Sequence, residues 1–117
     1  MPTGPNFIIC RASAGSGKTY RLVKQYLKLA FSASEQELHN RFKSILAITF
    51  TNKAANEMKD RVLSYLDEII DQGMGSSMAK DLCGELSVNI DTLQHYAKIV
   101  STSILHNYSD LAICTID

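Results

Sequence analysis

Residues 12–19 combine the side-chain types and the spacing that are needed to hold a phosphate group. Gly15 and Gly17 allow backbone angles that are closed to other residues, so consecutive N–H groups in this stretch can turn inward around an anion. Lys18 can then reach the β- and γ-phosphates of a nucleotide, and the hydroxyl of Thr19 can ligate a magnesium ion. The order of these groups predicts a site for ATP with Mg²⁺.

The stretch resembles a Walker A sequence, Gly-x-x-x-x-Gly-Lys-Ser/Thr, with Ala12 in place of the first glycine. Alanine can take that position if its backbone stays out of the left-handed region. Lys18 and Thr19 are the predicted catalytic residues, and Thr19 is the predicted Mg²⁺ ligand. The predicted nucleotide-binding residues are Ala12, Ser13, Ala14, Gly15, Ser16, Gly17, Lys18 and Thr19.

The flanking sequence predicts the elements that would position this loop. The apolar run Phe7–Cys10 indicates a strand buried on both faces. Apolar residues then recur at helical spacing at Leu22, Val23, Tyr26, Leu27 and Ala30. A flexible glycine-serine turn before a lysine is the alternative, but the order of strand, loop and helix favours phosphate binding at a helix N-terminus.

The rest of the chain repeats this alternation. Ser32–Asn40 reads as a connection or short helix, and Ile45–Phe50 as a second buried strand. Thr51 or Asn52 can cap the helix that follows. Its apolar positions are Ala55, Met58, Val62, Leu66 and Ile69, and Gly73, Gly75, Ser76 and Ser77 end it.

Residues 78–105 are expected to form two helices, and residues 111–116 a third buried strand. Strands that alternate with helices imply right-handed crossovers and a parallel sheet, hence the α/β class. Leu66-Asp67-Glu68 mimics the acidic signature that holds magnesium in ATPases. We reject that interpretation because an unbroken helical pattern runs through it, which favours a solvated acidic pair.

Bulk properties limit the classes of function. The 117 residues suit one domain, and 12 basic against 12 acidic residues leave no global positive field to attract nucleic acid. No apolar run approaches the length of a membrane span, and the start lacks a signal peptide's pattern, so we expect a cytoplasmic protein with no membrane partner. The three cysteines and three histidines show no metal-ligand spacing, and Cys10, Cys83 and Cys114 read as buried structural thiols.

The second strand and the start of the next helix carry the most specific resemblance. Residues 47–58, Ala-Ile-Thr-Phe-Thr-Asn-Lys-Ala-Ala-Asn-Glu-Met, resemble motif Ia of superfamily 1 DNA helicases, the UvrD, Rep and PcrA group. Alanine commonly replaces the first Walker A glycine in that group. The chain has no glutamine-containing adenine motif before Phe7, and residues 114–117 resemble the approach to the next DNA-contacting motif. Both features point to the RecB and AddA helicase-nuclease branch.

The resemblance implies that residues 1–117 are the N-terminal part of the first motor domain, a truncated P-loop NTPase (RecA-like) three-layer fold with a parallel sheet. The parent protein would be an ATP-dependent DNA helicase or helicase-nuclease of DNA repair and recombination that translocates on single-stranded DNA. The implied DNA-binding residues are Phe50, Thr51, Asn52 and Lys53. Their alternatives are a core phenylalanine, an ordinary helix cap and a solvated charge.

Within these 117 residues there is no recognisable acidic magnesium pair, catalytic base, arginine finger or second motor lobe, so we expect no ATP turnover by this chain alone. A small-molecule or nucleotide kinase is the main rival. Its lid would need clustered arginines, whereas Arg21, Arg41 and Arg61 are scattered. A noncatalytic interaction module is a third interpretation. The sheet also predicts self-association, with a stable monomer as the alternative.

Overall fold

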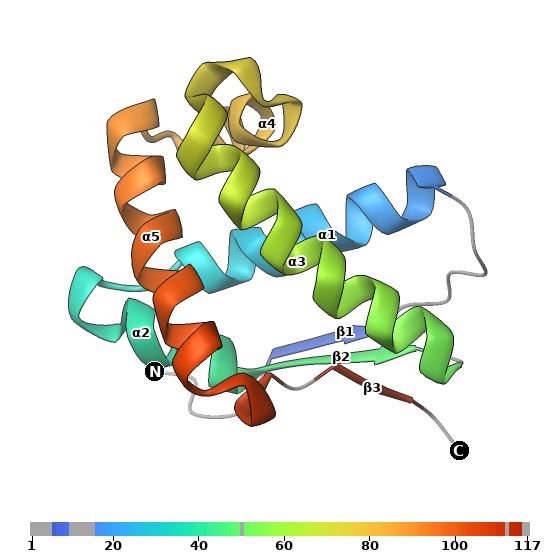
Figure 1. Cartoon of the computed structure of the whole chain (residues 1–117). Helices are drawn as coiled ribbons and strands as arrows, with labels where there is room; N and C mark the ends of the chain where they lie inside the picture. The colour runs from blue at the N-terminus through green and yellow to red at the C-terminus, as the bar shows by residue number, and fades with distance from the viewer. Residues whose placement is uncertain (1–5, 10–15, 50, 112, 116–117) are drawn as a thin grey trace.

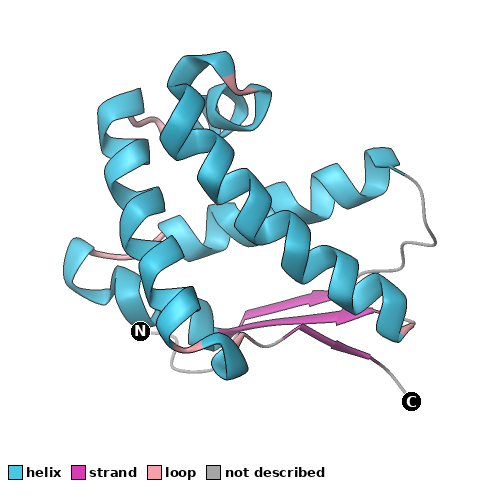
Figure 2. Cartoon of the chain, in the orientation of Figure 1, coloured by secondary structure: helices cyan, strands magenta, loops and turns pink. Residues whose placement is uncertain are grey.

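The computed structural model describes residues 6–9, 16–49, 51–111 and 113–115 of the chain. Helices make up most of these residues, and three short parallel strands lie along one side of them (Figure 2). The strands are β1 (Asn6–Ile9), β2 (Ile45–Thr49) and β3 (Ile113–Thr115), in the order β1-β2-β3. Ala47 of β2 pairs with Ile8 of β1 and with Ile113 of β3. Parallel strands joined by helices are therefore present in the described chain.

The long helices all lie on the same face of these strands (Figure 1). They are α1 (Ser16–Phe31), α3 (Asn52–Gln72), α4 (Ser77–Leu86) and α5 (Ile90–His106). The strand order explains this arrangement, because successive right-handed crossovers that advance in one direction leave their helices on one face. The described residues thus form two layers, and they contain no third layer of the predicted three-layer fold.

This arrangement corrects the expectation that the second strand is buried on both faces. Along β2, Ile45, Ala47 and Thr49 are buried, whereas Leu46 and Ile48 are only half-buried. Side chains of a strand alternate between its two faces, so Leu46 and Ile48 point away from the helices. The sequence concealed this asymmetry because both sets of side chains are largely apolar.

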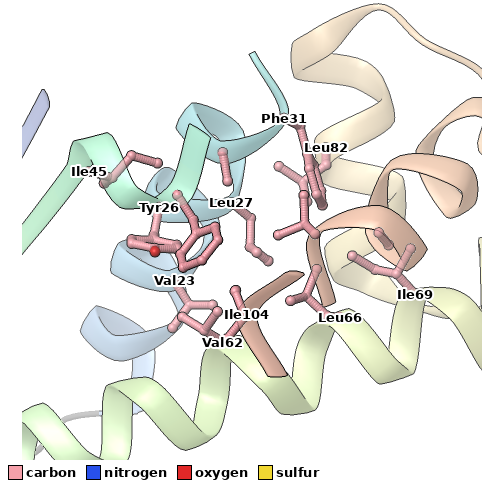
Figure 3. Close-up of a cluster of buried hydrophobic side chains, with 14 of the residues drawn as sticks. Val23, Tyr26, Leu27, Phe31, Ile45, Val62, Leu66, Ile69, Leu82 and Ile104 are labelled. Carbon is pink, nitrogen blue, oxygen red and sulfur yellow. The ribbon is translucent and has the colours of Figure 1, made fainter. Parts of the chain in front are cut away.

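The helices surround one apolar core (Figure 3). Val23, Tyr26 and Leu27 of α1 pack in the same cluster as Val62 and Leu66 of α3, and all five are fully buried. The helical spacing in the sequence predicted this inward face for both helices. The core therefore fixes α1, whose N-terminus follows the candidate phosphate loop, against α3.

Short elements complete the chain. The predicted connection over Ser32–Asn40 contains η1 (Glu35–Glu37) and α2 (Leu38–Arg41), and η2 (Phe42–Ser44) leads into β2. The third strand is shorter than predicted, since η4 (Tyr108–Asp110) ends just before Leu111 and pairing begins at Ile113. Outside residues 1–5, 10–15, 50, 112 and 116–117, no helix is long and apolar enough to cross a bilayer.

The predicted break after α3 is built around Gly73, which has φ +56° and ψ −127°. Residues with a Cβ avoid this backbone region, so glycine is required at the turn. The side chain of Gln94 on α5 donates from Nε2 to the carbonyl oxygens of Ile69 and Ile70, at 3.1 and 3.2 Å. These two hydrogen bonds satisfy carbonyl groups that the helix end leaves without partners. η3 (Gly73–Gly75) then leads to α4.

The cysteine prediction is only partly testable. Cys83 on α4 is half-buried and packs against the core, and it is a free thiol whose pKa is raised by burial. It is therefore less enclosed than we expected. Cys114 lies in β3, and Cys10 lies outside the described residues.

Candidate nucleotide-binding site

The candidate nucleotide and DNA residues converge on one edge of the sheet. β1 and β2 run parallel, so their carboxyl ends lie at the same edge. α1 begins at Ser16, beyond the end of β1, and α3 begins at Asn52, beyond the end of β2. Figure 1 shows both helix N-termini on the side to which the strands point. This edge is where open parallel sheets bind their ligands.

The first turn of α1 contains the second half of the predicted phosphate loop. Ser16, Gly17, Lys18 and Thr19 are helical, so their N–H groups and the positive end of the helix dipole lie at the start of α1. This turn carries no acidic side chain, which would repel phosphate. The donor set of helix N–H groups, one ammonium and one hydroxyl fits a nucleotide phosphate with its magnesium ion. Ala12–Gly15 lie outside the described residues.

Thr51 caps α3, as the sequence predicted. Its backbone is extended, with φ −134° and ψ 155°, and its side-chain oxygen accepts a hydrogen bond from the N–H of Ala54 at 3.0 Å. The buried hydroxyl of Thr49 donates to the carbonyl oxygen of Thr51, also at 3.0 Å. Together these bonds fix the chain between β2 and α3, and they confirm that Thr51 has at least a structural role.

The other predicted DNA contacts are accessible where the structure describes them. Thr51, Asn52 and Lys53 are all exposed, in the first turn of α3 and at its cap. Phe50 lies outside the described residues. Accessible polar side chains at a helix N-terminus are suited to contact phosphate, so the DNA assignment of these residues stays a prediction.

The acidic pair that mimics a magnesium-binding motif lies within a helix, as we expected. α3 runs without a break from Asn52 to Gln72, so Asp67 and Glu68 do not end a strand. Asp67 is exposed, and Glu68 accepts a hydrogen bond from Ser76. Neither carboxylate is placed at the sheet edge where α1 begins.

Sequence analysis missed a polar cluster around Tyr20, the residue directly after Thr19. The hydroxyl of Tyr20 donates to Oδ2 of Asp81 on α4 at 2.6 Å. The ring of Tyr20 meets that of Tyr65 on α3 edge to face, with centroids 5.8 Å apart. Burial raises the pKa of Tyr20 most, and the hydrogen bond to Asp81 raises it further. Tyr20 therefore joins three helices while remaining next to the candidate phosphate site.

Ion pairs continue this cluster along α1 and α4. Nζ of Lys24 lies 3.0 Å from Glu85 and 3.8 Å from Asp81, and Nζ of Lys28 lies 3.3 Å from Glu85. The two lysines lower the pKa of Glu85 through these contacts. The signal in the sequence was the matched spacing of four residues, in Tyr20, Lys24 and Lys28 on one helix and in Asp81 and Glu85 on the other.

The whole chain, residues 1–117, matches the family model of the UvrD/REP helicase N-terminal domain. Among curated proteins it is similar to an ATP-dependent helicase/nuclease of Lactobacillus johnsonii, with 36% identity over 90 residues, which are 76% of this chain and 7% of the relative.

An ATP-dependent helicase/nuclease of Pediococcus pentosaceus is 30% identical over 105 residues, covering 86% of this chain and 8% of that protein. The RecBCD enzyme subunit RecB of Buchnera aphidicola is 39% identical over 57 residues, covering 46% and 5%. The chain thus spans 5 to 8% of the length of these relatives. No solved structure matches it.

Proposed function

Since this chain belongs to the UvrD/REP helicase N-terminal domain family, we propose that it is the ATP-binding segment of an ATP-dependent DNA helicase or helicase-nuclease. The observation that carries the proposal is the position of Ser16–Thr19, which form the first turn of α1 at the carboxyl edge of a parallel sheet. The relatives named ATP-dependent helicase/nuclease and RecB support the helicase-nuclease branch. The proposal also includes a RecA-like fold, of which the described layers would form part.

The residues assigned to the nucleotide are Ala12–Thr19. Backbone N–H groups of the loop and of the first turn of α1 would surround the phosphates, and Lys18 would neutralise their charge. Thr19 would contribute its hydroxyl to Mg²⁺. Hydrolysis of the bound ATP would supply the free energy for movement along DNA.

Single-stranded DNA would pass the same edge of the sheet, at the start of α3. Asn52 and Lys53 are exposed there, and they can contact phosphate oxygens through an amide and an ammonium. Phe50 would stack on a base, a contact that tolerates any sequence. An enzyme that steps along DNA needs contacts of this kind, which do not depend on sequence.

The kinase alternative gains no support from the described arginines. Arg41 donates from Nε to the carbonyl oxygen of Leu29, near the C-terminal end of α1 and far from its first turn. Arg21 and Arg61 are exposed on different helices. These side chains therefore do not form the converging clamp that a kinase lid requires.

Titration calorimetry with ADP and Mg²⁺ tests the nucleotide assignment directly. We expect Lys18→Ala to weaken binding at least about tenfold, because it removes a charge-assisted contact to phosphate. Lys98→Ala is the matched control, since Lys98 is exposed on α5 and belongs to no candidate site. Equal affinities of the wild type and Lys18→Ala would contradict the proposal.

A further inference from the structure

Tyr20 is placed to control the orientation of the candidate phosphate-binding turn. It follows Thr19 directly in the sequence, and its ring reaches from α1 to Tyr65 of α3 and Asp81 of α4. The residue is half-buried, and Asp81 is 61 positions away in the sequence. A tertiary contact therefore holds the helix within one residue of the predicted Mg²⁺ ligand.

The contact between Tyr20 and Asp81 differs from the ion pairs beside it. It is a short O–H to carboxylate hydrogen bond of 2.6 Å, a type that is stronger and more directional than a neutral one. Lys24 and Lys28 are 25% and 45% exposed, so their pairs with Glu85 are screened by water. Of the links between α1 and α4, the Tyr20 bond is also the nearest to the loop.

Orientation of the first turn decides which groups face the phosphate. Each residue turns a helix by about 100°, so a small rotation of α1 about its axis moves both Lys18 and Thr19 away from a bound anion. Helix ends fray unless side chains hold them. A nucleotide that binds a frayed turn must order it, and this lowers the affinity.

We propose that Tyr20 and Asp81 are a positioning pair, whose hydrogen bond holds the first turn of α1 in the orientation that presents Lys18 and Thr19 to the phosphates and Mg²⁺. The inference rests on the proposed nucleotide site and adds two residues to it, one of them on α4. The role does not involve contact with the ligand. It requires the tyrosine hydroxyl and a hydrogen-bond acceptor at position 81.

Four variants separate this role from simple attachment of α4. Tyr20→Phe removes the hydroxyl but keeps the ring against Tyr65, and Asp81→Ala removes the acceptor. Asp81→Asn restores an acceptor without the charge. Glu85→Ala is the matched control, because it breaks the ion pairs of Lys24 and Lys28 between the same two helices.

The measurement is the dissociation constant of MgADP by calorimetry, at a temperature well below the lowest unfolding midpoint of the set. We expect Tyr20→Phe and Asp81→Ala each to weaken binding about fivefold, the size of one hydrogen bond. The double variant should be no weaker than either single one. Asp81→Asn should recover most of the affinity, and Glu85→Ala should match the wild type.

A purely structural role would lower unfolding midpoints and leave the dissociation constants of the folded variants unchanged. Unchanged MgADP affinity in Tyr20→Phe, in a chain whose wild type binds, overturns the positioning pair and leaves the proposed function standing. Additive losses in the double variant, or an equal loss in Glu85→Ala, also overturn it. No binding by the wild type overturns both proposals.

Discussion

Ser76 donates a hydrogen bond from its hydroxyl to the carboxylate of Glu68, 2.5 Å away, and this contact joins the cap of α4 to α3. Ser76 is buried, and its oxygen also accepts the N–H of Ala79 at 3.2 Å. The carboxylate that most resembles a catalytic acid in the sequence is thus engaged in the turn between two helices. Its role is to position α4, which in turn carries the acceptor of Tyr20.

Replacing Glu68 with alanine should destabilise the fold and spare nucleotide binding. The change leaves the buried hydroxyl of Ser76 without its acceptor, which costs about 1 to 2 kcal/mol of unfolding free energy. Glu68→Gln keeps an acceptor and should lose less. Urea unfolding and MgADP calorimetry on the same samples check both effects.

Phosphate release provides the opposing test for this residue. We expect no ATPase activity above background from the 117-residue chain, with or without single-stranded DNA. A turnover that rises with DNA and disappears in Glu68→Gln would show that this carboxylate is catalytic.

Removing the hydroxyl of Tyr26 should stabilise the protein. The side chain is fully buried, and its oxygen has no hydrogen-bond partner among the described residues. An unpaired buried hydroxyl loses its hydration without compensation, so Tyr26→Phe should raise the unfolding free energy by about 1 kcal/mol at neutral pH. Thermal or urea unfolding measures this directly, and a clear loss of stability would show that the hydroxyl has a partner.

The same variant should change the response to alkaline pH. Burial raises the pKa of Tyr26 above its ordinary value of 10.0, so the native state keeps the proton that the unfolded state releases. The stability contributed by this group is complete below pH 10 and falls as the pH rises beyond it. We expect a smaller loss of stability above pH 10 in Tyr26→Phe than in the wild type. Identical slopes would contradict a raised pKa.

Two glycine substitutions should act in opposite directions. Gly73 has a positive φ, and an added Cβ would lie 3.0 Å from Nε2 of Gln94. Gly73→Ala should therefore cost about 1 to 3 kcal/mol. Gly84 lies in α4 with open space around it, so Gly84→Ala should stabilise by up to about 1 kcal/mol. Denaturant unfolding of both variants checks the pair, and similar effects would mean that backbone strain at Gly73 is unimportant.

The parts of the fold that the sequence predicted are those that local patterns determine. The spacing of apolar residues located α3 and its buried face, Thr51 marked the start of this helix, and Gly73 marked its end. Each of these signals depends on neighbours within a few residues. Local chemistry was therefore sufficient for them.

The parts that were missed depend on which distant residues meet. Tyr20 and Asp81 are separated by 61 positions, and only the packing of α4 against α1 brings them together. The half-exposed face of β2 was hidden because Leu46 and Ile48 are as apolar as a buried strand requires. For the site itself, the sequence supplied the residue types, and the structure located the described ones at one sheet edge.

The uncovered face of the sheet leads to the last prediction, which concerns association. Leu46 and Ile48 are half-buried and point away from the helices, and β1 and β3 each pair with only one strand among the described residues. An apolar sheet face and unpaired strand edges favour contact with a second copy of the chain. We therefore expect the apparent mass from light scattering to rise with concentration.

A charge on the uncovered face should suppress this association. Leu46→Lys places an ammonium where a second chain would pack, while the opposite face of β2 stays against the core. Leu105→Lys is the matched control, because Leu105 is 62% exposed on α5, away from the strands. We expect Leu46→Lys to remain monomeric and Leu105→Lys to associate like the wild type. A wild-type chain that stays monodisperse at high concentration and melts cooperatively would show that the helices cover the sheet sufficiently.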